Sequence, residues 1–127
     1  MIFDYSPTGF GVLRPLLDIK IGAAEFDVKA LVDSGSVNSL FPSWVAREAG
    51  IDLSGGSLKD IRVGGISDVA TFVKVQMKTA GLVWEADVGF CSAVTDWGLL
   101  GHESFFRYFE VNFRAADSQF EVIKIEE

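Results

Sequence analysis

The sequence predicts an all-β fold, a small closed barrel or a sandwich with one or two short helices. Apolar and polar residues alternate with a period of two in about seven short segments. Turn residues separate these segments roughly every ten positions, which is typical of small barrels and sandwiches. Helix-like patterns are confined to two short segments, 43–49 and 102–107.

Length and composition indicate one globular domain over residues 1–127. Hydrophobic residues make up 49% of the chain and charged residues 23%, which is ordinary for a protein with a buried core. The net charge of -7 and the scattered basic residues argue against nucleic acid and membrane as partners. We expect a cytoplasmic protein, because no segment has the pattern of a signal peptide or a membrane span.

The chain has one cysteine and one histidine. Cys91 cannot form an internal disulfide, and its alternating apolar surroundings predict a buried thiol rather than a nucleophile. His102 has no neighbouring Cys or His cluster, so we expect neither a metal site nor a cofactor. No acid or nucleophile is visibly paired with His102, and we assign it no role.

The first half of the chain predicts a hairpin followed by a helix. Residues 17–21 and 26–30 alternate as strands, and the turn 22–24 joins them. Residues 43–49 suit a short helix, with Ser43 as its N-cap and Gly50 as its C-terminal stop.

The second half predicts a long hairpin over 61–77 whose tip is Gly64-Gly65. Residues 84–90 form the next strand. An apolar run, Leu99-Leu100-Gly101, precedes the helix expected at 102–107. Two more strands, 109–113 and 120–125, complete the chain.

The most unusual stretch is the one around Asp33, where an apolar strand runs directly into an acid. A carboxylate there is costly unless hydrogen bonds or a second group stabilise its charge. Asp followed by Ser and Gly is also a common turn former, and the tripeptide alone favours that interpretation. The alternative is a functional site.

Three motifs, in this order, resemble those of the retropepsin-like aspartic proteases. They are Leu31-Val32-Asp33-Ser34-Gly35-Ser36, a hairpin tipped by Gly64-Gly65-Ile66, and Leu99-Leu100-Gly101 before a short helix. In that family the first motif carries the catalytic acid and the glycine-tipped hairpin is the flap. The resemblance covers about residues 17–113 and implies a small closed barrel with a flap.

The resemblance also implies a role for each residue of the first motif. Asp33 would be the catalytic acid. Ser34 would form a hydrogen bond to the same loop of a second subunit. Gly35 would let backbone amides approach the carboxylate. Ser36 would donate to the outer oxygen of Asp33.

Aspartic proteolysis needs two carboxylates about a hydrogen bond apart. The chain has a single Asp-Ser-Gly, and Asp96-Trp97-Gly98 has the wrong flanking residues. The resemblance therefore implies a homodimer in which two Asp33 carboxylates meet on the two-fold axis. The flap residues Gly64, Gly65 and Ile66 would close over an extended polypeptide substrate by strand pairing.

The sequence departs from the family at His102-Glu103, where the family has Arg followed by Asp or Asn. This departure leaves a second hypothesis, a non-catalytic member of the fold that serves in dimerisation or peptide binding. A third is a structural β domain in which Asp33 only shapes a turn. The segment after Phe113 is longer than in the viral enzymes, so the pairing of the terminal strands stays open.

Overall fold

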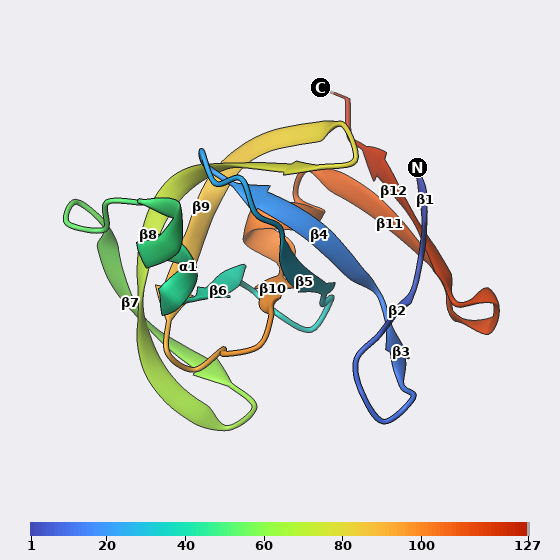
Figure 1. The fold of residues 1–127 in the computed structure, drawn as a ribbon, viewed down its shortest axis with the longest axis horizontal. Coiled ribbons are helices and arrows are strands. Elements are labelled where there is room, and N and C mark those ends of the chain that lie inside the picture. The colour runs from blue at the N-terminus through green and yellow to red at the C-terminus, as the bar shows by residue number, and fades with distance from the viewer. Residues whose placement is uncertain (127) are drawn as a thin grey trace.

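The chain forms a closed β-barrel (Figure 1). The computed structural model describes residues 1–126, and Glu127, the last residue of the predicted domain, lies outside it. The barrel strands are β4 (Leu16–Ile21), β5 (Val28–Val32), β6 (Leu40–Pro42), β8 (Ile66–Thr79), β9 (Leu82–Cys91) and β10 (Gly98–Leu100). They are arranged in the order β4-β5-β10-β6-β9-β8, and β8 pairs with β4 to close the ring. The predicted all-β barrel is therefore confirmed.

The glycine-tipped hairpin is also confirmed. β7 (Ser57–Val63) pairs with the first half of β8 and is the outermost strand of its sheet. Gly64 and Gly65 have φ angles of 55° and 86°, as the two central residues of a type I′ turn require. Ile66 is the first residue of β8 rather than part of the tip, and it is 59% exposed.

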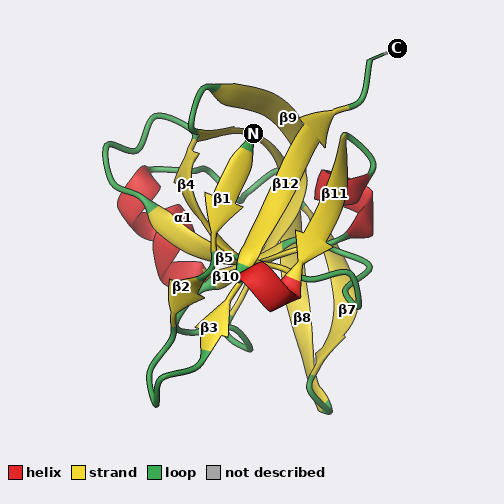
Figure 2. Cartoon of the chain, turned by 90° about the vertical axis from the view of Figure 1, so that its right-hand side faces the viewer, coloured by secondary structure: helices red, strands yellow, loops and turns green. Residues whose placement is uncertain are grey.

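The two ends of the chain pair with each other. β1 (Ile2–Asp4), β12 (Gln119–Lys124) and β11 (Phe109–Arg114) form an antiparallel sheet in that order (Figure 2). Phe120 in the central strand stacks on Phe3 at 5.4 Å and on Phe113 at 6.5 Å between ring centroids. The terminal strands, whose pairing the sequence leaves open, thus pair within one chain.

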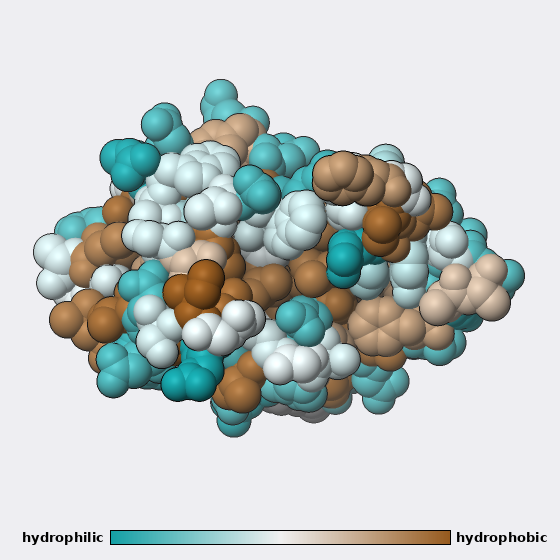
Figure 3. Space-filling view, turned by 90° about the horizontal axis from the view of Figure 1, so that it is seen from below, coloured by the Kyte–Doolittle hydropathy of each residue, from teal (hydrophilic) through white to brown (hydrophobic). Residues whose placement is uncertain are grey.

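A small hairpin of β2 (Ser6–Pro7) and β3 (Leu13–Arg14) follows β1. It projects from the same side of the molecule as the β7–β8 tip, as Figures 1 and 2 both show. Seen from this side, apolar surface lies across the middle of the molecule (Figure 3).

The helical segments are short. α1 (Ser43–Ala49) ends at Gly50, whose φ of 68° is left-handed, as expected. The predicted N-cap is wrong: Ser43 is already helical, and Pro42 occupies the cap position without a side-chain hydrogen bond. η1 (His102–Phe106) is a single π-helical turn, and η2 (Ala115–Asp117) is a 3-10 turn between β11 and β12. No helix in residues 1–126 is both long enough and apolar enough to span a membrane.

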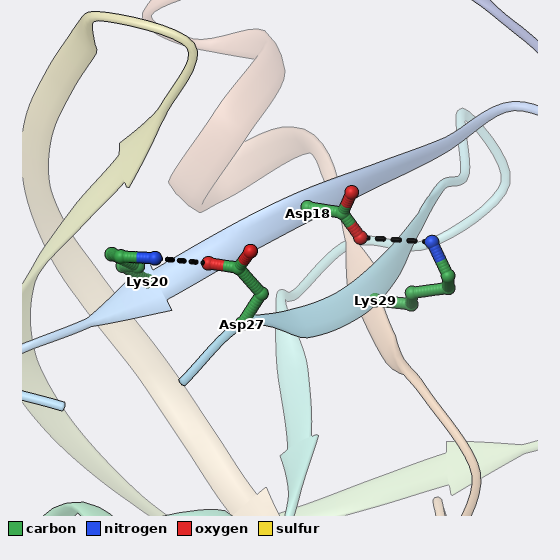
Figure 4. A network of polar contacts seen from close by, with 4 residues as sticks. All are labelled: Asp18, Lys20, Asp27 and Lys29. Carbon is green, nitrogen blue, oxygen red and sulfur yellow. Dashed lines mark hydrogen bonds and ion pairs between the residues drawn. The ribbon is translucent and has the colours of Figure 1, made fainter. Parts of the chain in front are cut away.

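The hairpin that leads to Asp33 has one buried and one charged face. Leu17, Ile19 and Ile21 of β4 face the core. On the outer face Lys29 Nζ lies 2.8 Å from Asp18, its partner across the strands, and Lys20 Nζ lies 2.6 Å from Asp27 (Figure 4). Exposed ion pairs of this kind each stabilise the folded state by at most about 1 kcal/mol, so burial of the inner face contributes more to the stability of the hairpin.

Candidate active site

The barrel fixes the backbone of Asp33. This residue directly follows β5, and its N–H donates to Leu100 O in the parallel neighbour β10 at 3.0 Å. The N–H of Ser36 donates back to Asp33 O at 3.1 Å and closes a tight turn. The Asp33 side chain is half-buried. The acid therefore stands at the end of a core strand.

Gly35 forms a hydrogen bond to the Asp33 carboxylate, and Ser36 does not. The Gly35 N–H donates to Asp33 Oδ1 at 2.9 Å. A Cβ at position 35 would lie 3.2 Å from the same oxygen, so glycine permits the close approach. The Ser36 hydroxyl donates to Asn38 O at 2.7 Å. Its predicted bond to Asp33 is therefore wrong, because the hydroxyl finds a backbone acceptor two residues along its own loop.

The loop 33–39 rests on the junction between β10 and η1. The N–H groups of His102 and Glu103 donate to Ser36 O and Val37 O, each at 2.9 Å. These two bonds satisfy donors at the start of η1, which have no acceptor within the helical turn. The first two residues of η1, directly after the third sequence motif, thus hold the loop of the first motif.

Gly101 lies closest to this loop. Its N–H donates to the buried Ser39 Oγ at 3.0 Å. A Cβ at position 101 would collide with the carbonyl oxygens of Ser36 and Asn38. The glycine of the Leu-Leu-Gly motif is therefore required by close contact between two backbone segments.

His102 contacts the turn through its side chain as well. Its Nε2 lies 2.6 Å from Ser34 O. Its ring packs against the Phe106 ring, with ring centroids 5.1 Å apart. Sequence reasoning assigned His102 no role. The contact joins residues 68 positions apart, and its only sequence signal is the motif that places residue 102 beside the loop.

The core holds η1 in place. Phe105 is fully buried and packs edge-on against Trp84, with ring centroids 5.7 Å apart. Trp84 Nε1 donates to Ser104 O at 2.9 Å. These buried contacts fix Ser104 and Phe105, which follow His102 and Glu103 in the same turn.

A cleft of about 460 Å³ opens beside Asp33. One wall is formed by Asp33, residues 35–38, Leu40 and Leu99, and the other by residues 60–63 of β7 with Gly64. The cleft brings together four of the seven residues that the sequence singles out: Asp33, Gly35, Ser36 and Gly64. The other three, Ser34, Gly65 and Ile66, do not line it.

The walls of the cleft are chemically mixed. Leu40, Ile61 and Leu99 supply apolar surface, and Asp60 and Arg62 supply charge. Because β7 is the outermost strand of its sheet in the described chain, its outer backbone groups are open to another strand. An extended peptide fits such an edge by main-chain hydrogen bonding, while side-chain pockets receive alternate residues.

Two other sequence candidates lie outside this cleft. Cys91 is buried, as predicted, and burial raises the pKa of its thiol, so the side chain stays protonated and unreactive. Asp96 lies in the exposed loop before β10 and does not line the cleft.

No family model matches the chain, and no curated protein matches it significantly. Function therefore has to be inferred from the residues around Asp33 and from their geometry.

Proposed function

We propose that the protein is an aspartic endopeptidase of the retropepsin-like type. The observation that carries the proposal is an acid at the end of a barrel strand that accepts a turn amide at 2.9 Å and opens into a cleft walled by a glycine-tipped hairpin. The order of the three motifs along the chain supports the same family. The proposed setting is the cytoplasm, since a single buried thiol needs no oxidising compartment.

The proposed enzyme is a homodimer, because one chain supplies one Asp-Ser-Gly turn. In the dimer the two Asp33 carboxylates would share one proton, since two charges a hydrogen bond apart do not both ionise. The ionised carboxylate removes a proton from water as the water oxygen attacks the scissile carbonyl. The protonated one donates to the carbonyl oxygen. Collapse of the diol then returns a proton to the leaving amine.

The proposed substrate is an extended polypeptide with apolar residues next to the cleaved bond. The apolar cleft residues Leu40, Ile61, Val63 and Leu99 support this preference. The free edge of β7 supports binding in an extended conformation.

The test is cleavage of unfolded polypeptides at mildly acidic pH by the purified protein and by Asp33→Asn. Asparagine cannot act as a general base, so we expect pepstatin-sensitive cleavage to fall at least about a hundredfold. Asp96→Asn is the matched control. It makes the same chemical change in an exposed loop outside the cleft, and we expect full activity.

Two outcomes would contradict the proposal. Unchanged activity in Asp33→Asn would exclude aspartic catalysis at this turn. If the wild-type protein binds extended peptides but cleaves none across the pH range, the alternative of a non-catalytic peptide-binding module holds.

Asp60→Asn tests the other acid of the cleft. Complete loss of activity in this variant would favour a site within one chain.

A further inference from the structure

We propose that His102 is a positioning residue that orients the Asp33 carboxylate through the peptide unit joining Ser34 to Gly35. This inference rests on the proposed function, because it takes that carboxylate as the reacting group. It adds a residue that neither the sequence motifs nor the proposed chemistry includes.

Two hydrogen bonds act on opposite ends of this one peptide unit. His102 Nε2 lies 2.6 Å from its carbonyl oxygen, which belongs to Ser34. Its N–H, which belongs to Gly35, donates to Asp33 Oδ1 at 2.9 Å. A peptide unit is planar, so a bond that holds the carbonyl also sets the direction of the N–H. The imidazole therefore controls the direction of the Gly35 N–H, from which the Asp33 carboxylate accepts a hydrogen bond.

The same arrangement strengthens that donor. A hydrogen bond to the carbonyl polarises the peptide and makes its N–H a better donor. Imidazole donates from Nε2 both as the Nε2–H tautomer and as imidazolium. Either of these forms can donate from Nε2 to Ser34 O.

His102 is held ready for this contact. Its own N–H donates to Ser36 O at 2.9 Å, and its ring rests against Phe106. The neighbouring charged residue, Glu103, pairs with Arg107, the C-cap of η1, at 3.2 Å.

The experiment compares two amide side chains of different reach. In His102→Gln the side-chain nitrogen matches the position of Nε2, whereas in His102→Asn it is too short to reach Ser34 O. His102→Leu removes the donor and is expected to behave like the asparagine variant. Arg107→Gln is the control, because it removes a charge at the C-terminal end of η1, where Arg107 pairs with Glu103.

Two measurements report on each variant. The first is the NMR chemical shift of the Gly35 amide proton, which reports the strength of its hydrogen bond and needs no activity. We expect an upfield shift in His102→Asn and a shift near wild type in His102→Gln. The second is kinetics. In His102→Asn we expect kcat to fall about tenfold with KM within about twofold, and in His102→Gln recovery to within about threefold of wild type.

A Gly35 resonance that stays unchanged in both His102→Asn and His102→Leu would overturn the inference, as would equal kcat values for the asparagine and glutamine variants. If the wild-type protein cleaves nothing, the proposed function fails on its own, and the Gly35 resonance still decides whether His102 controls this peptide unit.

Discussion

Gly101 shows how strongly a single residue constrains the turn that carries Asp33. Its Cα faces the carbonyl groups of Ser36 and Asn38, which are backbone atoms and cannot swing aside as a flexible side chain would. The loop and η1 approach each other as closely as they do because position 101 has no side chain.

Gly101→Ala is therefore expected to lower the free energy of unfolding by about 1–3 kcal/mol, since the added methyl group must push the loop or η1 away. Urea denaturation measures the change. Gly55→Ala is the control, because a Cβ there meets nothing within 4 Å, and a change within about 0.5 kcal/mol is expected. Equal effects at the two positions would contradict the close packing inferred at Gly101.

For single residues, the sequence identifies Asp33 as a candidate site but does not predict the hydrogen bonds formed around it. Asp33 stands out because a continuous apolar run leads into it. The contact between His102 and Ser34 O has no such signal in the sequence, since it depends on how η1 starts, 68 residues after Ser34. The Ser36 hydroxyl donates to Asn38 O rather than to the expected Asp33, and this choice depends on side-chain torsions that no pattern of residue types encodes.

Among the elements, the β7–β8 hairpin depends most on the conformation of its tip. Gly64 and Gly65 both adopt left-handed φ values, and a type I′ turn accepts asparagine at its first central position far better than a β-branched residue.

Gly64→Val is expected to destabilise the hairpin by about 1–2 kcal/mol, because valine strongly disfavours left-handed φ. Gly64→Asn should leave the hairpin intact. Hydrogen exchange of the β7 amides measures the difference, with faster exchange in the valine variant alone. Equal exchange in the two variants would show that the tip does not need this turn type. Peptide cleavage, where present, should follow the same order.

The predicted strands reveal which elements a residue pattern can identify. All seven predicted strands occur, as β4, β5, β7, β8, β9, β11 and β12. Residues 1–126 contain five more, β1, β2, β3, β6 and β10, each only two or three residues long. So short a segment cannot display a period of two, and β6 is buried at every position. The pairing of β1 with β12 joins the chain ends, which local patterns do not relate.

For the whole molecule, the consequence of one Asp-Ser-Gly turn is that the proposed active site belongs to two chains. In a dimer with two-fold symmetry, a residue that lies next to the axis faces the same residue of the other chain, as proposed for Asp33. Substitution of Asp33 in one chain would then disable the site that it shares with an unsubstituted partner.

Mixing the wild-type protein with Asp33→Asn tests this directly. If subunits exchange freely, a tenfold excess of the variant leaves about one eleventh of the wild-type chains in wild-type dimers. Cleavage per wild-type chain should therefore fall to roughly that fraction, because a heterodimer has one carboxylate and one amide and lacks the shared proton. The same excess of Asp96→Asn should leave the rate unchanged, which controls for crowding and competition for substrate. A rate that is unaffected by excess Asp33→Asn would mean that each chain holds a complete site, and the acid opposite Asp33 would then be Asp60 on β7.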